Sequence, residues 1–188
     1  MKVVFSPEVS TIAGYAREEA MRTGSYGISA DHLMLAMIRH EDNGACRILS
    51  ELGVGMEDFK DHLDSRIFKE KPVPYDDYDK IRLSRGAQSV LNMAAFEALR
   101  ADSHEITPEH MLLALVRDAD CCSSQYLSAN GVSREKVLEL MGSAQKTPAG
   151  KPQEKTEPSV PVKDIAGALG EQLGNVLESI SKQSNIFS

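Results

Sequence analysis

The stretch GISADHLMLAMIR, residues 27–39, returns 78 positions later as EITPEHMLLALVR, residues 105–117. The same shift of 78 aligns residues 5–63 with residues 83–141 over 59 positions without a gap, and 17 of the aligned pairs are identical. Most other apolar positions also align with apolar ones. A match of this length indicates a duplicated module. We call residues 5–63 repeat one and residues 83–141 repeat two.

Each repeat is predicted to begin with two amphipathic helices. In repeat one the first helix follows Ser6, a residue type that caps helices, and Pro7 suits the first helical position. Apolar residues then recur along one face at helical spacing in both copies. The second helix is predicted to open at Ser29 in repeat one and at Thr107 in repeat two.

Two further helices complete each predicted repeat. The third is short and ends at Gly53 or Gly131, where we expect the left-handed backbone of a helix stop. The fourth covers residues 56–68 in repeat one and residues 133–141 in repeat two. Strand-like alternation is absent. The expected fold is all-α: eight helices in two pseudo-symmetric four-helix repeats, joined by residues 69–82.

The charge and the cysteine content limit the classes of function. The chain has 28 acidic and 21 basic side chains, hence a net charge of −7, which argues against nucleic acid as the main partner. Three cysteines, an odd number, form neither a disulfide framework nor a metal spacing. No apolar run reaches the length of a membrane span, and the first residues are not a signal peptide. We therefore expect a soluble cytoplasmic protein with no membrane partner.

The chain after residue 142 differs in composition from the repeats. Five lysines and five acidic residues balance there, so the whole net charge lies in residues 1–142. Four prolines fall within 14 residues of this segment, which predicts a flexible linker over residues 143–161. Residues 1–142 are therefore expected to form the folded domain.

Residues 162–188 are predicted to contain an amphipathic helix, because apolar residues recur there at spacings of one, three and four. Two interpretations stay open: the helix folds back on the domain, or it docks on a partner or a second copy. Membrane insertion is disfavoured by the polar residues that interrupt the apolar face. The candidate docking residues are Leu169, Leu173, Val176, Leu177 and Ile180.

Motifs of catalytic chemistry are absent from the sequence. There is no GxxxxGK[ST] phosphate loop, no HExxH metal motif and no GxSxG nucleophile motif. The three cysteines also occupy unmatched positions in the two repeats, whereas a duplicated active site would repeat them. The sequence predicts no enzyme, no cofactor and no metal.

Two matched pairs of polar residues are the candidate ligand-binding positions. His32 and His110 occupy the same helical position in the two repeats, and we interpret them first as imidazoles that bond within their own half. The acids before them, Asp31 and Glu109, lie where backbone N–H groups are exposed, so each can either complement the helix dipole or accept a cationic group.

The duplicated segments, with FSPEV near the start, GISADHLMLAMIR and EITPEHMLLALVR, resemble the Clp N-terminal (double Clp repeat) domain. That family carries a T-E-H-[IL]-L-L-[GA]-[LI]-[IVL]-R signature twice, and the resemblance covers residues 3–142. It implies an all-helical, non-catalytic recruitment domain like that of Hsp100 unfoldases of the ClpA, ClpB and ClpC kind. Such a domain binds adaptor proteins, unfolded substrates or degradation tags.

The resemblance also implies site residues. In ClpC-like members the glutamate of each T-E-H motif contributes to a phosphoarginine pocket. Glu109 matches that glutamate, and Asp31 is one methylene shorter, while Ala30 and Pro108 replace the preceding threonine.

A second family surface is the groove between the halves near the chain start. There Phe5 matches the family aromatic, and Leu83 replaces it in the second copy.

The resemblance implies a substrate- or adaptor-binding module of the Clp chaperone-protease system. Its implied partners are unfolded or tagged proteins, adaptors, and Clp ATPase or peptidase subunits. The unfoldases continue into an AAA+ module through T-P-x-L-D-x-[FL], whereas here the linker leads to VKDIAGALGEQLGNVLESI, residues 162–180. The alternative is a stand-alone regulatory or assembly protein that docks on Clp subunits or self-associates through this last helix.

Overall fold

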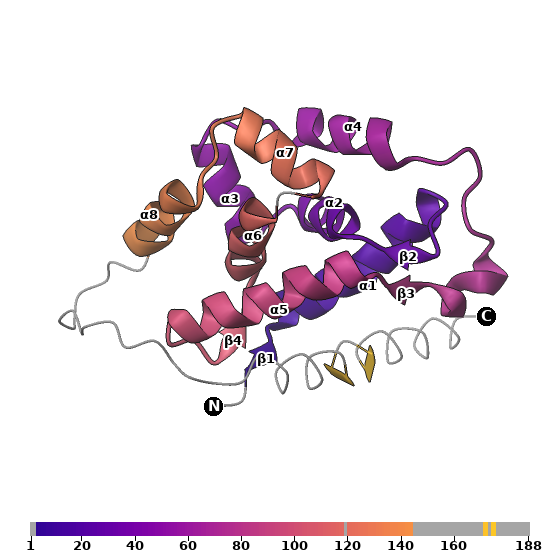
Figure 1. The fold of residues 1–188 in the computed structure, drawn as a ribbon, viewed down its shortest axis with the longest axis horizontal. Coiled ribbons are helices and arrows are strands. Elements are labelled where there is room, and N and C mark those ends of the chain that lie inside the picture. The colour runs from indigo at the N-terminus through magenta and orange to yellow at the C-terminus, as the bar shows by residue number, and fades with distance from the viewer. Residues whose placement is uncertain (1–2, 119, 145–170, 173, 176–188) are drawn as a thin grey trace.

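The computed structural model describes residues 3–118, 120–144, 171–172 and 174–175. Its two repeats each contribute four α-helices (Figure 1). Repeat one contains α1 (Pro7–Arg22), α2 (Ala30–His40), α3 (Gly44–Glu51) and α4 (Met56–Ile67). Repeat two contains α5 (Arg85–Arg100), α6 (Pro108–Arg117), α7 (Cys122–Ala129) and α8 (Arg134–Ala144). The eight-helix, all-α prediction is confirmed.

The predicted starts of α1, α2 and α6 and the predicted ends of α3 and α7 hold because the residues at these positions act as expected. The Ser6 hydroxyl accepts a hydrogen bond from the Val9 N–H at 3.2 Å, so α1 begins at Pro7. Gly53 and Gly131 follow α3 and α7 with φ angles of +81° and +70°, the left-handed backbone that ends a helix without a steric penalty.

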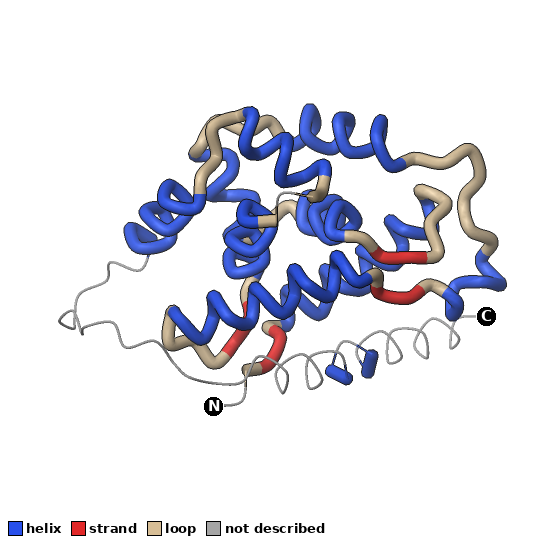
Figure 2. Tube along the Cα trace, viewed as in Figure 1, coloured by secondary structure: helices blue, strands red, loops and turns tan. Residues whose placement is uncertain are grey.

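Four two-residue strands join the repeats, and the sequence did not predict them. They are β1 (Val4–Phe5), β2 (Gly27–Ile28), β3 (Arg82–Leu83) and β4 (Glu105–Ile106). Strand β1 pairs in parallel with β4, and β2 pairs in parallel with β3, at two separate places (red in Figure 2). Each pair takes one strand from each repeat. Strands of two residues are too short to show an alternating pattern, so only the structure reveals them.

A single hydrophobic core extends through both repeats. The second helix of each repeat lies at its centre: every α2 residue from Ala30 to Ile38 is buried, as are seven of the ten residues of α6. Helix α3 packs against α6 of the other repeat, and α4 packs against α7. Neither repeat therefore completes its core alone.

The connection between the repeats contains one 3-10 helix, η1 (Tyr75–Lys80), within the predicted joining segment. Helix α8 continues three residues beyond its predicted end at residue 141, to Ala144, so the first two residues of the predicted linker over 143–161 are helical. The rest of that linker lies outside the described residues. Of the predicted helix over residues 162–188, residues 171, 172, 174 and 175 are described, and they are helical. Among the described residues no helix is long and apolar enough to cross a membrane.

Candidate functional site

Asp31 reaches across the repeat boundary and caps α7. Its carboxylate accepts hydrogen bonds from the Ser123 N–H at 2.7 Å, the Ser123 hydroxyl at 2.6 Å and the Cys122 N–H at 3.4 Å. The side chain is only 7% exposed. A carboxylate at a helix start satisfies free N–H groups and complements the helix dipole. Both oxygens of Asp31 are therefore occupied within the protein.

Glu109 takes the corresponding place in repeat two but is held differently. It lies against Gly44 at the start of α3, so closely that a Cβ on Gly44 would overlap the Glu109 carboxylate. Glu109 is half-buried and makes no hydrogen bond with any described residue. The equivalent of Gly44 in repeat two is Cys122, which faces the shorter Asp31. Glu109, the longer acid, therefore faces Gly44, the smaller of the two equivalent residues.

The Glu109 carboxylate lies in a pocket of about 530 Å³ at the repeat boundary, which we call the Glu109 pocket. Its wall combines one side of α3 over its whole length with the loop after α5, the start of α6 and the C-terminal half of α8. Besides Glu109 the lining residues include His110, Thr107, Ser103, Arg47 and Leu140. A half-buried carboxylate beside hydroxyl groups can accept a hydrogen bond from a cationic side chain.

His32 bonds within its own repeat. Its Nδ1 accepts the Ser29 N–H at 2.9 Å, and its Nε2 lies 2.7 Å from the Thr23 hydroxyl. Burial lowers the pKa of His32 to about 4. The imidazole is therefore neutral near pH 7 and fixes the first turn of α2, which agrees with the local interpretation of this residue.

His110 makes the same Nδ1 contact as His32 but has no equivalent of the contact between His32 and Thr23. Its Nδ1 accepts the Thr107 N–H at 3.1 Å, whereas Ala101 stands where Thr23 stands in repeat one. Burial lowers the pKa of His110 as well. Because His110 also lines the Glu109 pocket, it is the one histidine of the pair that the structure places beside a cavity.

The structure separates Phe5 from Leu83. Phe5 lies in β1 before α1, and Leu83 lies in β3, which pairs with the strand that follows α1. A 16-residue helix, about 24 Å long, therefore stands between them. Both side chains are partly buried against the core. Phe5 and Leu83 occupy equivalent positions of the two repeats, but they lie near opposite ends of α1 and do not share one site.

The thiols have no environment that would make them reactive. Cys121 caps α7, its sulfur accepting the Ser124 N–H at 3.4 Å, and burial raises the pKa of its thiol to about 12. Burial also raises the pKa of Cys46 and of Cys122. In the described part of the chain no group of three or more His, Cys, Asp or Glu side chains is placed to hold a metal ion.

Sequence reasoning missed the residues that α3 and α8 add to the pocket, such as Arg47 and Leu140, because their neighbours are distant in sequence. One signal was available: Glu109 aligns with a shorter acid, and Gly44 aligns with a larger residue. The candidate docking residues Leu169, Leu173, Val176, Leu177 and Ile180 lie outside the described residues, and their role stays a prediction.

Comparison with known sequences identifies relatives of the repeats. The Clp repeat (R) N-terminal domain family matches residues 4–130 and residues 82–164. The negative regulator of genetic competence ClpC/MecB of Bacillus subtilis is 28% identical over 143 residues, which are 74% of this chain. Chaperone protein ClpB of Oceanobacillus iheyensis is 26% identical over 143 residues, again 74% of this chain. The chain spans 17% of the length of either relative.

Solved structures share the fold. The Hsp104 N-terminal domain of Candida albicans superposes with a TM-score of 0.61 at 19% identity, over 77% of this chain and 93% of that one. The N-terminal domain of the ClpD chaperone from Arabidopsis thaliana gives a TM-score of 0.58 at 18% identity, over 76% of this chain and 94% of that one.

Proposed function

This chain belongs to the family of Clp repeat N-terminal domains, and from that premise we propose that it is a polypeptide-binding module of the Clp chaperone-protease system. Its partners are unfolded or tagged protein substrates, or the adaptor proteins that present them. The module acts by binding and performs no chemistry on its partner.

The observation that carries the proposal is the difference between the two cross-repeat carboxylates. Asp31 is buried and hydrogen-bonded to α7, so its role is structural. Glu109 occupies the equivalent place and makes no hydrogen bond with the described residues, although it lines a pocket. A carboxylate that lines a cavity and has no hydrogen bond to the described residues is available to accept one from a cationic ligand group.

The pocket suits a basic side chain of a polypeptide. The Glu109 carboxylate would accept its charged N–H groups, and the hydroxyls of Ser103 and Thr107 add further acceptors. Leu140 and Met141 of α8 supply apolar surface for the aliphatic stem of a lysine or arginine. The net charge of −7 attracts basic chains over a longer range.

The test is binding of an unfolded basic protein to the full chain. Reduced, carbamidomethylated lysozyme, which stays unfolded, is labelled and titrated in a fluorescence-anisotropy assay, with native lysozyme as the folded control of similar charge. We expect the unfolded form alone to bind, with a Kd on the order of tens of micromolar. No binding in that range would overturn the proposal.

The role of Glu109 is tested in the same assay with the variant Glu109→Gln, which keeps the shape and removes the charge. We expect the affinity to fall about tenfold, because a charge-assisted hydrogen bond is lost. The matched control is Glu105→Gln, which removes an exposed charge outside the pocket and should leave the affinity unchanged. Equal affinities of Glu109→Gln and the unmodified chain would exclude this pocket as the cation site.

A further inference from the structure

A second hollow lies entirely in repeat one, between the end of α1 and helices α2, α3 and α4. Its volume is about 780 Å³, within the usual range of ligand sites. Leu35 and Ile38 of α2 and Met56 of α4 form its apolar floor. We call it the repeat-one groove.

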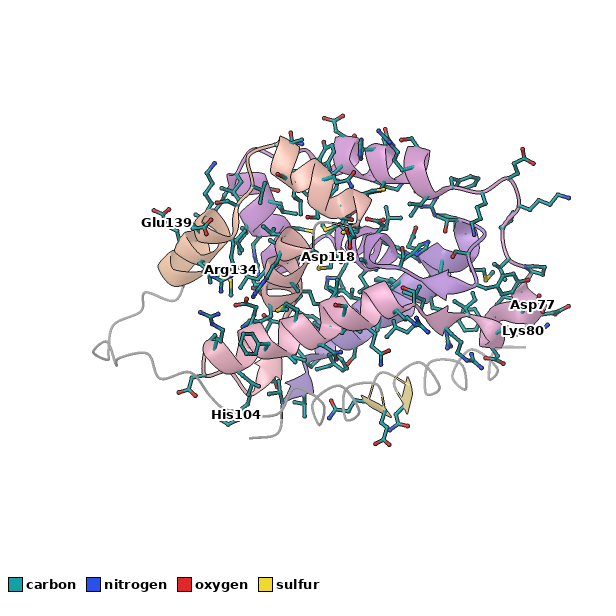
Figure 3. All side chains as sticks on the ribbon, in the orientation of Figure 1. Asp77, Lys80, His104, Asp118, Arg134 and Glu139 are labelled. Atoms are coloured by element: carbon teal, nitrogen blue, oxygen red, sulfur yellow. The ribbon has the colours of Figure 1, made fainter. Side chains whose placement is uncertain are left out.

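One position that lines the groove differs in chemistry between the two repeats. Met56, the first residue of α4, aligns with Arg134, the first residue of α8. The Arg134 guanidinium crosses to α5 and pairs with the buried Glu97, 2.8 Å from its Oε2 (Figure 3 labels Arg134 on α8). Met56 makes no such bridge; in repeat one Glu19, the equivalent of Glu97, pairs with Arg22 and Arg39, and Met56 lines the groove.

The rim of the groove carries an excess of unpaired negative charge. Its four basic residues, Arg22, Arg39, Arg47 and Lys60, each form an ion pair with an acidic side chain of repeat one. Three acidic residues on the rim, Glu41, Glu51 and Glu57, form no ion pair within the described part of the chain. All three are exposed.

We propose that the repeat-one groove binds an extended or helical polypeptide segment in which apolar side chains alternate with lysine or arginine. The apolar side chains pack on Leu35, Ile38 and Met56, and the basic ones pair with Glu41, Glu51 and Glu57. Methionine suits such a floor, because its flexible side chain adapts to different apolar partners. This inference rests on the proposed polypeptide-binding function and adds a second subsite with a stated preference.

Charge complementarity selects this occupant over the end of the chain itself. Residues 162–180 contain one lysine and three acidic residues, so that segment carries the same sign of charge as the rim. A basic partner gains ion pairs at the rim, whereas an acidic segment would meet like charges there.

The experiment measures binding of synthetic ten-residue peptides to the full chain by fluorescence anisotropy. The first peptide contains leucines flanked by lysines; in the second, glutamates replace the lysines, and in the third, serines replace the leucines. We expect the lysine–leucine peptide to bind at least tenfold more tightly than either of the others. Equal binding of the glutamate peptide would overturn the inference.

The decisive variant is Met56→Arg, which places in repeat one the residue type that repeat two has at the equivalent position, Arg134. We expect the new guanidinium to add a positive charge to the floor of the groove and to weaken binding of the lysine–leucine peptide at least tenfold. The matched control is Asp61→Asn, which makes the same change in net charge on an exposed residue of α4 outside the groove. It should leave the affinity unchanged.

Two further arms keep the inference falsifiable. If Met56→Arg does not fold, the variant Glu41→Gln/Glu57→Gln must lower the affinity for the lysine–leucine peptide, and an unchanged affinity overturns the inference; both residues line the groove and neither lines the Glu109 pocket. A chain shortened after Ala144 must bind the peptide as the full chain does; an affinity raised tenfold or more would assign the groove to the removed segment instead.

Unfolded lysozyme, titrated in parallel, separates this inference from the proposed function. If it binds the unmodified chain while Met56→Arg leaves peptide binding unchanged, the groove assignment fails and the binding function stands. If it does not bind the unmodified chain at all, the proposed function itself fails.

Discussion

Repeat one and repeat two place the same helices in the same order, yet they treat equivalent positions in opposite ways. In repeat one the short acid Asp31 is buried, and its carboxylate caps α7. In the Glu109–α3 contact a longer acid is left without a hydrogen-bond partner and faces a pocket. The same holds for Arg134, which bridges to the buried Glu97, against Met56, which leaves a groove open.

This difference shows how a duplicated domain can combine stability with recognition. The two repeats share one core, so a strong contact made by one of them also holds the other in place. The equivalent position in the other repeat can then carry a polar group without a hydrogen-bond partner, or an exposed apolar surface, without loss of the fold. Four experiments test this division between structural and binding positions, in order of decreasing effect.

The largest expected effect is the loss of the Asp31 cap. Asp31→Ala leaves the Ser123 hydroxyl and two N–H groups of α7 without their acceptor in a buried place, which should cost about 3–4 kcal/mol of unfolding free energy. Glu109→Ala removes a half-buried group without hydrogen bonds and should cost less than about 1 kcal/mol. Denaturant unfolding measures both, and equal costs would remove the distinction between the two acids.

The second effect is a loss of stability in acid caused by His32. The pKa of His32 is 6.5 in the unfolded chain and about 4 in the folded one, so between these values the unfolded state binds more protons. Stability therefore falls as the pH drops from 6.5 to 4, by up to about 3 kcal/mol, and this loss is complete below pH 4.

The variant His32→Gln isolates that contribution, because glutamine at this helical position keeps a capping contact with Ser29 and does not titrate. Its unfolding free energy should fall less between pH 6.5 and 4 than that of the unmodified chain. The matched variant in repeat two is His110→Gln. His110 has no equivalent of the Thr23–His32 contact, because Ala101 aligns with Thr23. An unchanged pH profile of His32→Gln would contradict the assignment.

A third, smaller effect concerns the match in size between Gly44 and Glu109. Gly44→Ala places a methyl group against the Glu109 carboxylate and should cost about 2 kcal/mol. Adding Glu109→Asp restores the pairing that Cys122 and Asp31 show in repeat two, and should recover most of the loss. A double-mutant cycle measures this coupling. Simple additivity of the two changes would show that the sizes are not matched.

The smallest effect is a gain of stability at the start of α7. Asn43 caps α3 with its Oδ1, 3.0 Å from the Cys46 N–H, and also donates to the Met37 carbonyl at 2.9 Å. Cys121 takes the same place with a weaker sulfur acceptor. Cys121→Asn should therefore raise the unfolding free energy by about 1 kcal/mol, as measured by thermal unfolding. The reverse change, Asn43→Cys, should lower it; a destabilised Cys121→Asn would show that α7 cannot accept the amide.

Local features made most of the fold predictable from the sequence. Ser6, Ser29 and Thr107 mark helix starts through contacts within three or four residues, and Gly53 and Gly131 mark helix ends through their backbone alone. The duplication then carried each assignment from one repeat to the other. These signals need no knowledge of the tertiary structure.

The site was harder to predict because its contacts join distant residues. Asp31 is hydrogen-bonded to a residue 92 positions away, so the sequence could present it only as a complement to the dipole of its own helix or as a possible cation site. The alignment of the repeats nevertheless contained the needed signs. Met56 and Arg134 differ in charge, and Gly44 and Cys122 differ in size, at otherwise equivalent positions. Met56 lines the repeat-one groove, and Gly44 lines the Glu109 pocket at the repeat boundary.

The most direct test of the division between the repeats is a titration of the isotope-labelled full chain with the lysine–leucine peptide, followed by amide NMR. The account predicts shift changes around Leu35, Ile38 and Met56, with the equivalent residues Leu113, Val116 and Arg134 unchanged. Equal shift changes at the two sets of residues, or changes at Leu113, Val116 and Arg134 alone, would contradict it.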